Sequence, residues 1–328
     1  MEPVKLGIIG CGLAAANLHW PTLRNMQDRF SLVVVCDSEE KKAKSFSKAT
    51  GGVPYVLDSQ EVLSRSDVEA ADIVLPVDLH YSVAKQALEA GKHVFLEKPL
   101  AMDLKQAELL VNLANRYPQV KIVGENFRYR RALWRLKEHL EYGMIGQPYA
   151  AFCHLMAAFY LADYAKTSWR QQQRFSGGVV TDVGIHYAAQ LRLLFGELTV
   201  DSAFAQSANP DLGRIDSLSF SFSSAQGLKG VMNLFLGVRD YFSEGILILG
   251  ADGSLSGGQF GSDFGNFRIA LHKNGQVREE IIENDTGLEE EFSDFYQAVR
   301  SGGSIKSSFS EAFSDLKLIL NAVGLATS

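Results

Sequence analysis

The segment HVFLEKP, residues 93–99, decides how the first half of the chain folds. Its apolar run, 94–96, follows a helical pattern that ends at Gly91, which predicts a buried strand of a parallel sheet. In open α/β sheets ligands bind beyond the carboxyl ends of the strands, so we expect Lys98 at the edge of a ligand site. Pro99 restricts Lys98 to extended backbone angles. The alternative is a surface Glu–Lys pair that ends a strand.

The composition narrows the class of protein. The 328 residues are enough for two domains and a sizeable core. A net charge of −6 argues against nucleic acid or an anionic membrane as the main partner, because both require a basic face. Cys11, Cys36 and Cys153 are scattered, which suits a reducing compartment and offers neither a disulfide framework nor a metal spacing. With no signal-peptide pattern and no apolar run of membrane-spanning length, we expect a cytoplasmic protein.

A glycine-rich turn, residues 10–15 (GCGLAA), joins an apolar run at 4–9 to a helical pattern that continues to about residue 24. This is the Ala-ending form of the dinucleotide-binding fingerprint, in the strand–helix context that it requires. Gly10 makes the turn, and Gly12 lets the backbone approach a pyrophosphate at the helix N-terminus. We expect the cofactor contacts to continue through the next two residues, Leu13 and Ala14.

Asp37 ends the second predicted strand, 32–36. A carboxylate at this place can bind the two ribose hydroxyls of NAD and repel the 2′-phosphate of NADP. It can also cap the helix that starts near Glu39, and the two roles are compatible. Asp37 thus favours NAD, whereas Ser38, Lys41 and Lys42 lie close by and leave room for the 2′-phosphate of NADP, so the choice of cofactor stays open.

Strands and helices alternate through the first part of the chain. Further strands are predicted at 53–55, 71–75 and 121–123, and helices at 39–50, 59–64, 81–90 and 103–117. This alternation predicts a doubly wound parallel (Rossmann) sheet, in a dinucleotide-binding domain of residues 1–124.

From residue 199 onward strands predominate, at 199–206, 217–223, 228–235, 243–249, 267–272 and 277–282. Their period-2 alternation predicts an open-faced, mostly antiparallel sheet in a second, α+β domain of residues 125–328. Its last helix, 309–326, is a candidate to pack back on the first domain. A long loop, 160–175, is rich in Tyr, Trp and Gln, and such loops are usually functional.

The segment 177–186 (GGVVTDVGIH) places Asp182 and His186 four residues apart, on one face of a helix that starts at Thr181 or Asp182. A carboxylate there can orient an imidazole. Three interpretations compete: a satisfied core pair, half of a metal site, and a catalytic pair. No further ligands cluster nearby in the sequence, so we expect no metal.

Several segments together resemble one known family. They are the turn at 10–12, Leu75-Pro76 with His80, the segment 90–101 (AGKHVFLEKPLA), 124–129 (GENFRY) and the block at 177–186. They are similar to the glucose–fructose oxidoreductase / inositol dehydrogenase / rhizopine-catabolism (Gfo/Idh/MocA) family. Val77 stands where the family often has Asn, so a polar contact to the cofactor from this position is not expected.

The resemblance implies an NAD(P)-dependent oxidoreductase that transfers a hydride between nicotinamide and a sugar, cyclitol, polyol or related carbonyl compound. It implies that Lys98 contacts both nicotinamide and substrate oxygen, and that Asp182 and His186 lie across the substrate from it. Such a pair suits proton removal by His186 and charge stabilisation by Lys98. Pro76, His80 and Glu97 join the expected cofactor contacts. Glu97 could also orient Lys98, or be a capping or salt-bridge residue. Candidates for lining the substrate pocket, by position only, are Arg128, Tyr160, Tyr164, Trp169 and Arg170.

Two other functions fit parts of the sequence. A non-catalytic nucleotide-sensing regulator could share the fold, although such proteins tend to lose the lysine or the histidine. A turn that binds S-adenosylmethionine would explain Asp37 but leave the two diagnostic blocks without a role. We also expect a homodimer or homotetramer joined by the open sheet, through an apolar face that bears Val231, Leu234 and Leu236. The last two helices could instead bury these three residues.

Overall fold

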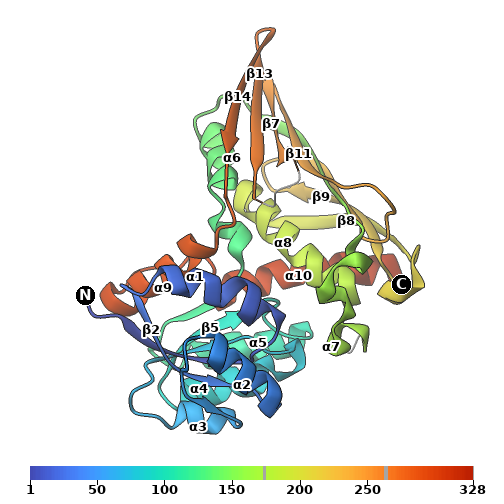
Figure 1. Cartoon of the computed structure of the whole chain (residues 1–328). Coiled ribbons are helices and arrows are strands. Elements are labelled where there is room, and N and C mark those ends of the chain that lie inside the picture. Colours follow the sequence, from blue (N-terminus) through green and yellow to red (C-terminus); the bar gives the residue numbers. More distant parts are fainter. Residues whose placement is uncertain (173–174, 262–264, 328) are drawn as a thin grey trace. The chain divides into compact units, whose positions relative to one another are not determined.

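The computed structural model describes residues 1–172, 175–261 and 265–327. The chain forms two compact units, Met1–Asn126 with Leu288–Ser314 and Phe127–Gly287 with Asp315–Ser328 (Figure 1). Residues 288–314, which the sequence places in the second domain, therefore pack with the first unit. In the described part of the chain, no helix is both long and apolar enough to cross a membrane.

The first unit contains a six-stranded sheet in the order β3-β2-β1-β4-β5-β6, with every neighbouring pair parallel. This confirms the predicted doubly wound sheet. Its strands are β1 (Val4–Ile9), β2 (Phe30–Cys36), β3 (Tyr55–Val56), β4 (Ala70–Ile73), β5 (His93–Glu97) and β6 (Lys121–Gly124). The strand order reverses between β1 and β4, and the crevice beyond such a switch point is where open α/β sheets bind ligands.

Helices connect these strands, and two of them begin at a capping aspartate. They are α1 (Trp20–Asn25), preceded by a π-helical turn, η1 (Ala15–His19), then α2 (Glu40–Ala49), α3 (Ser59–Leu63), α4 (His80–Glu89) and α5 (Leu104–Ala114). The Asp58 and Asp103 carboxylates cap α3 and α5 by accepting backbone N–H bonds. A short 3₁₀ turn, η2 (Val77–Leu79), leads into α4.

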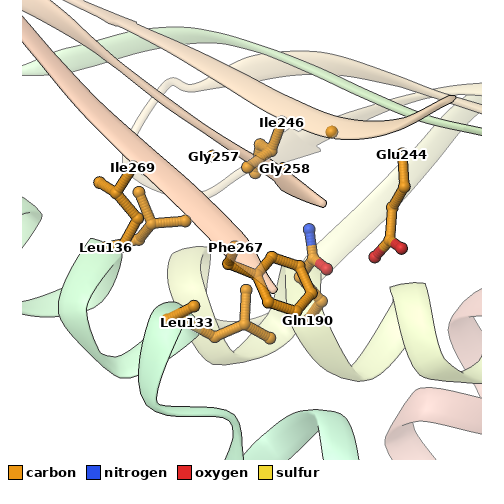
Figure 2. Close-up of a pocket in the computed structure, with 11 residues that line it drawn as sticks. Leu133, Leu136, Gln190, Glu244, Ile246, Gly257, Gly258, Phe267 and Ile269 are labelled. Atoms are coloured by element: carbon orange, nitrogen blue, oxygen red, sulfur yellow. The ribbon is translucent and has the colours of Figure 1, made fainter. Parts of the chain in front are cut away.

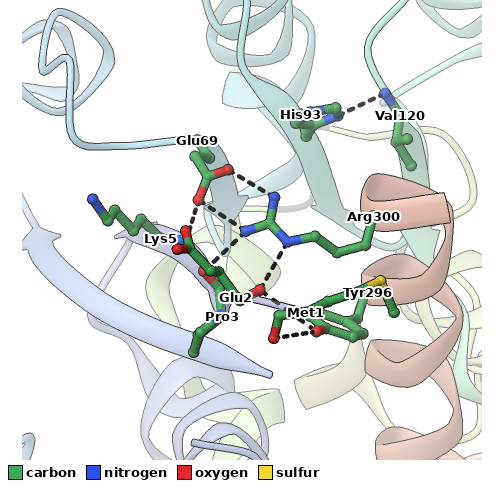
Figure 3. A network of polar contacts seen from close by, with 9 residues as sticks. All are labelled: Met1, Glu2, Pro3, Lys5, Glu69, His93, Val120, Tyr296 and Arg300. Atoms are coloured by element: carbon green, nitrogen blue, oxygen red, sulfur yellow. Dashed lines mark hydrogen bonds and ion pairs between the residues drawn. The ribbon is translucent and has the colours of Figure 1, made fainter. Parts of the chain in front are cut away.

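Helix α9 (Leu288–Ser301) completes the core of the first unit. The Phe292 ring stacks on Phe95 of β5, with ring centroids 4.4 Å apart. At the end of the helix, Arg300 donates to both Glu69 oxygens, at 2.8 and 3.0 Å, and to the backbone carbonyls of Glu2 and Pro3 (Figure 3). Arg300 thus joins the start of β1, the segment before β4 and α9.

The second unit contains an eight-stranded sheet in the order β14-β13-β12-β11-β7-β10-β9-β8. Only the β7–β10 neighbours are parallel, which confirms the mostly antiparallel prediction for the described chain. The strands are β7 (Pro148–Met156), β8 (Leu198–Gln206), β9 (Ser217–Ser224), β10 (Lys229–Phe235), β11 (Ser243–Gly250), β12 (Gly253–Gln259), β13 (Phe267–Lys273) and β14 (Gln276–Ile282). The sequence did not predict β12, whose glycines and serines have low strand propensity and which forms by pairing on both sides.

The helices of the second unit are α6 (Arg131–Glu141), α7 (Ser168–Gln171) and α8 (Gly178–Phe195), and α10 (Phe309–Thr327) begins in the first unit and continues here. Short 3₁₀ turns are η3 (Asn126–Tyr129), η4 (Phe159–Leu161), η5 (Asp163–Lys166) and η6 (Pro210–Leu212). The predicted loop at 160–175 thus contains η5, α7 and part of η4 among its described residues.

The expected apolar face requires a correction. Leu234 and Leu236 are fully buried, and a Cβ on Gly184 of α8 would lie 2.8 Å from both Leu234 and Ile319 of α10. Val231 points to the opposite face, because side chains alternate along a strand. There it pairs in register with Phe152, which is 47% exposed and also pairs with Leu247.

We predict that Arg300→Gln lowers the free energy of unfolding by about 1–2 kcal/mol, because it removes charge-assisted hydrogen bonds at a partly exposed site. The Arg300 hydrogen bond holds the pKa of Glu69 below its usual value of 4.5. This stabilisation is therefore present above the usual glutamate pKa and is lost as pH falls through the lowered one. Urea unfolding at pH 7 and below pH 4 should show the cost of the substitution shrinking in acid.

Arg24→Gln, at an exposed position on α1, is the matched control and should cost little at either pH. Equal costs for the two variants at pH 7 would contradict the role of Arg300.

Candidate active site

The glycine-rich turn after β1 has two glycines with different roles. Gly10 has φ +106°, and a Cβ on it would lie 2.1 Å from the Val74 carbonyl oxygen, so the fold itself requires glycine there. A Cβ on Gly12 would meet nothing within 4 Å. Gly12 thus leaves open space at the start of the helix that continues through half-buried Leu13 and Ala14. This cradle fits the pyrophosphate of a dinucleotide.

Asp37 lies beside this turn. Its Oδ2 accepts the Cys11 backbone N–H at 3.0 Å, and its Oδ1 accepts the Glu39 N–H at 2.9 Å. The bond to Glu39 precedes α2 (Glu40–Ala49) and is not a cap of its first turn, because Glu39 is the N-cap residue and α2 has no side-chain cap bond. The bond that ties the end of β2 to the glycine-rich turn was not foreseen. Burial, with the Asp37 charge as the second cause, raises the pKa of the Cys11 thiol to about 12, so this thiol is neutral at physiological pH.

Glu97 is the last residue of β5, and Lys98 follows it directly. Glu97 Oε2 accepts the Lys98 backbone N–H at 2.9 Å, and Glu97 Oε1 lies 2.9 Å from His19 Nε2. The Glu97 side chain is only 16% exposed and Lys98 is half-buried. The carboxylate that was expected to contact the cofactor is therefore directed into the unit, where it holds the backbone of the lysine.

His80 is also directed inward. Its Nδ1 lies 2.9 Å from the Pro99 carbonyl and its Nε2 2.9 Å from the Leu75 carbonyl, with 1% of the residue exposed. Burial lowers the pKa of His80, so the ring is neutral and donates to one of the two carbonyls. His80 braces the loops that follow β4 and β5, whereas half-buried Pro76 lies at the start of η2.

Sequence reasoning missed His19. Its ring is 2% exposed and lies between Asp72 of β4 and Glu97 of β5. The available signal was Asp72 itself, a charged residue in an apolar central strand. Such a residue is almost never buried without a partner.

In the second unit, α8 begins at Gly178, three residues before the first predicted start. The Asp182 carboxylate is 2% exposed and accepts from Arg170 Nε at 2.7 Å and Nη2 at 3.4 Å. His186 is half-buried and stacks on the Phe127 ring, with centroids 4.6 Å apart. Asp182 thus holds α7 through Arg170, a partner that the sequence did not suggest.

Arg170 contacts two aromatic residues of the loop. Its guanidinium lies 4.1 Å from the centre of the Trp169 ring and 5.6 Å from that of Tyr164. Tyr160 is half-buried in η4. Of the expected substrate-lining residues, Trp169 and Tyr164 therefore lie around Arg170, which binds Asp182.

Arg128 requires a correction. It is 4% exposed and donates to both oxygens of Asp315, at 2.5 and 3.1 Å. Asp315, which is 1% exposed, also accepts from Arg192. A buried guanidinium paired in this way belongs to the core, because removing it would leave a buried carboxylate without one of its partners. We therefore withdraw Arg128 from the substrate-lining residues.

A small apolar pocket between α6, α8 and the sheet contains none of the predicted site residues (Figure 2). Its lining includes Leu133, Leu136, Ile246, Phe267 and Ile269. Among the described residues, no group of three or more His, Cys, Asp or Glu side chains is placed to bind a metal ion.

Known proteins resemble both halves of the chain. Residues 4–125 match the model of an oxidoreductase family with an NAD-binding Rossmann fold, and residues 133–256 match a Gfo/Idh/MocA C-terminal domain. An oxidoreductase from Thermotoga maritima is 31% identical, with a TM-score of 0.91 over 99% of this chain and 97% of its own.

Curated relatives match as well. An uncharacterized protein from Saccharomyces cerevisiae is 32% identical over 66% of this chain and 62% of its own length. D-apiose dehydrogenase from Paraburkholderia graminis is 26% identical over 84% and 71%. The chain spans only 53–62% of the length of the first curated relatives that it matches. The matched models and the Thermotoga structure together establish that this chain belongs to the Gfo/Idh/MocA family of oxidoreductases, whose N-terminal domain is an NAD-binding Rossmann fold.

Proposed function

We propose that this protein is an NAD(P)-dependent dehydrogenase or reductase of a sugar, cyclitol, polyol or related carbonyl compound. The observation that carries the proposal is the placement of Lys98, at the carboxyl end of β5 in the sheet that also presents the glycine-rich turn and Asp37. The similarity to D-apiose dehydrogenase supports a sugar-like substrate. The presence of Lys98, Asp182 and His186 favours catalysis over nucleotide sensing alone.

The residues have complementary chemical roles in this proposal. A bound nicotinamide supplies the hydride acceptor or donor. Lys98 stabilises the negative charge that develops on the substrate oxygen. His186 takes the hydroxyl proton during oxidation and returns it during reduction. Asp182, through Arg170, fixes the loop that carries Trp169, whose ring face suits a sugar.

We predict that NADH binds at least tenfold more tightly than NADPH, a difference of about 1.4 kcal/mol. The Asp37 carboxylate would bind ribose hydroxyls and repel a 2′-phosphate. Asp37→Asn keeps one hydrogen-bond acceptor for the turn but removes the charge, so it should bring the dissociation constants of NADH and NADPH closer together. Fluorescence titration with both nucleotides measures the two constants.

Glu40→Gln, an exposed carboxylate on the following helix, is the control and should leave the ratio of the two dissociation constants unchanged. A wild-type protein that prefers NADPH tenfold would refute the role assigned to Asp37.

We predict that Lys98→Met and His186→Asn each lower turnover by about 10² to 10⁴ and leave NADH affinity within a few-fold. The double variant should lose little more than the worse single one, because residues that act as a unit are not additive. Turnover with a polyol panel and melting temperature are measured on the same samples.

His139→Asn, at the end of α6, controls for the loss of a histidine and should keep normal turnover. If His186 only packs against Phe127, its substitution lowers the melting temperature while turnover per folded molecule stays normal. That result would remove His186 from the mechanism.

We infer that two or four copies assemble through the open face of the eight-stranded sheet, centred on Phe152 with Val231 and Leu247. An apolar centre on a sheet face favours burial against a second copy. Light scattering should give a multiple of the 36.1 kDa chain mass. Phe152→Asp should lower the measured mass toward that of one chain, whereas Leu109→Asp, at an exposed position on α5, should leave it unchanged. A wild-type monomer at all concentrations would contradict this assembly.

A further inference from the structure

A buried chain of three ionisable side chains lies beneath the lysine segment, within the first unit. His19 Nδ1 is 2.9 and 3.1 Å from the two oxygens of Asp72, and His19 Nε2 is 2.9 Å from Glu97 Oε1. Asp72 is fully buried and His19 is 2% exposed. The side chains come from three elements, η1, β4 and β5, so the contact fixes the turn after the glycine-rich segment against the centre of the sheet.

Proton counting and the surrounding charges together set the charge of the ring. Burial raises the pKa of Asp72, and the charge of His19 and its hydrogen bond oppose that rise. A neutral imidazole carries one N–H and can donate to only one of two carboxylates. Both short contacts are hydrogen bonds to ionised carboxylates only if His19 is an imidazolium. Burial opposes this charge, but the charges of Asp72 and Glu97 and the hydrogen bonds to them raise the pKa of His19 well above its usual value.

One further acid, Glu291, and two aromatic rings lie around His19. Glu291 of α9 is 1% exposed, and burial, followed by the charges of Glu97 and Glu125, raises its pKa well above the usual value. Burial therefore favours the neutral, protonated form of Glu291. The Phe95 and Phe292 rings meet the imidazole edge-on at 5.6 and 5.5 Å and exclude water from it.

Glu97 connects this cluster to the lysine. One of its oxygens faces His19, and the other accepts the backbone N–H of Lys98. We propose that protonated His19 is a positioning residue, which holds the Glu97 carboxylate and through it the backbone of Lys98. This inference rests on the proposed function only in assigning a catalytic role to Lys98, and His19 itself is not proposed to touch substrate or cofactor.

The positioning can be tested without any turnover, by hydrogen exchange of the Lys98 amide in the full chain. His19→Gln keeps a donor group, the side-chain amide, but removes the positive charge, so Glu97 loses the cation that holds it. Exchange at Lys98 should accelerate at least tenfold in this variant. His93→Gln, the same substitution at the start of β5, is the matched control and should leave Lys98 protection near normal. Unchanged exchange in a folded His19→Gln protein would overturn the proposal.

The charge state is measured by ¹⁵N NMR of the histidine rings, with the His19 signals assigned by their loss in His19→Gln. Both ring nitrogens of His19 should carry protons at pH 8, and Asp72→Asn should move deprotonation to lower pH. Because the pKa of His19 is higher in the folded than in the unfolded protein, the contacts of its charged ring stabilise the fold fully below about pH 6.5, the usual histidine pKa. This stabilisation is lost as pH rises through the raised pKa. The stability difference between wild type and His19→Gln should therefore shrink in alkali. A neutral His19 at pH 7 would refute the imidazolium.

Kinetics then separates positioning from mere stability. His19→Gln and Glu97→Gln should each lower kcat about 10- to 100-fold, with KM and NADH affinity within about threefold. Their double variant should be no slower than the slower single one. Normal kcat per folded molecule in both single variants would make the cluster structural only. A wild-type protein inactive on every polyol and carbonyl tested would count against the proposed function, while hydrogen exchange and NMR would still decide the role of His19.

Discussion

A charge buried at the centre of a parallel sheet is the constraint on which the first unit depends. Asp72 is fully buried on β4, between β1 and β5, and an unpaired carboxylate there would cost several kcal/mol. His19 satisfies it from the last residue of the π-helical turn, a conformation found frequently at functional sites. The helix that begins at Leu13, directly after Gly12, must therefore lie in one place against the sheet. The residue that stabilises the core also sets the position of the nucleotide turn.

The same constraint explains why the chain returns to the first unit. His19 offers one positive charge to the two carboxylates of Asp72 and Glu97, and α9 covers this cluster with Phe292 and with Glu291, a buried acid whose pKa is raised by burial. Arg300 fastens the far end of this helix to the start of β1 and to Glu69 (Figure 3). Residues 288–301 are thus part of the nucleotide-binding unit, although more than 160 residues separate them from β6.

Local sequence predicted those parts of the protein that depend on local interactions. Apolar strands bounded by glycine-rich turns gave the parallel sheet, and alternation gave the antiparallel one. The sequence also predicts the two faces of β10, because the side chains of Val231 and Leu234, three positions apart in a strand, must point to opposite sides of the sheet. In contrast, β12 forms mainly through its neighbours. Tertiary packing alone brings His19 to Asp72 and Glu97, which lie 53 and 78 positions further along the chain, and Arg128 to Asp315. No periodicity in the sequence reveals these contacts.

Buried arginines take the corresponding role in the second unit. The fully buried Arg130 guanidinium lies 3.3 Å from the centre of the Phe127 ring, and His186 stacks on that same ring. Asp182 is bound by Arg170, so much of its negative charge is compensated locally. The position of His186 therefore depends on Phe127 and the cation beside it as well as on its helix. The Asp182–Arg170 pair in turn connects that helix to the aromatic loop, so a block that looks like an isolated Asp–His motif in the sequence is one part of a larger, fixed arrangement.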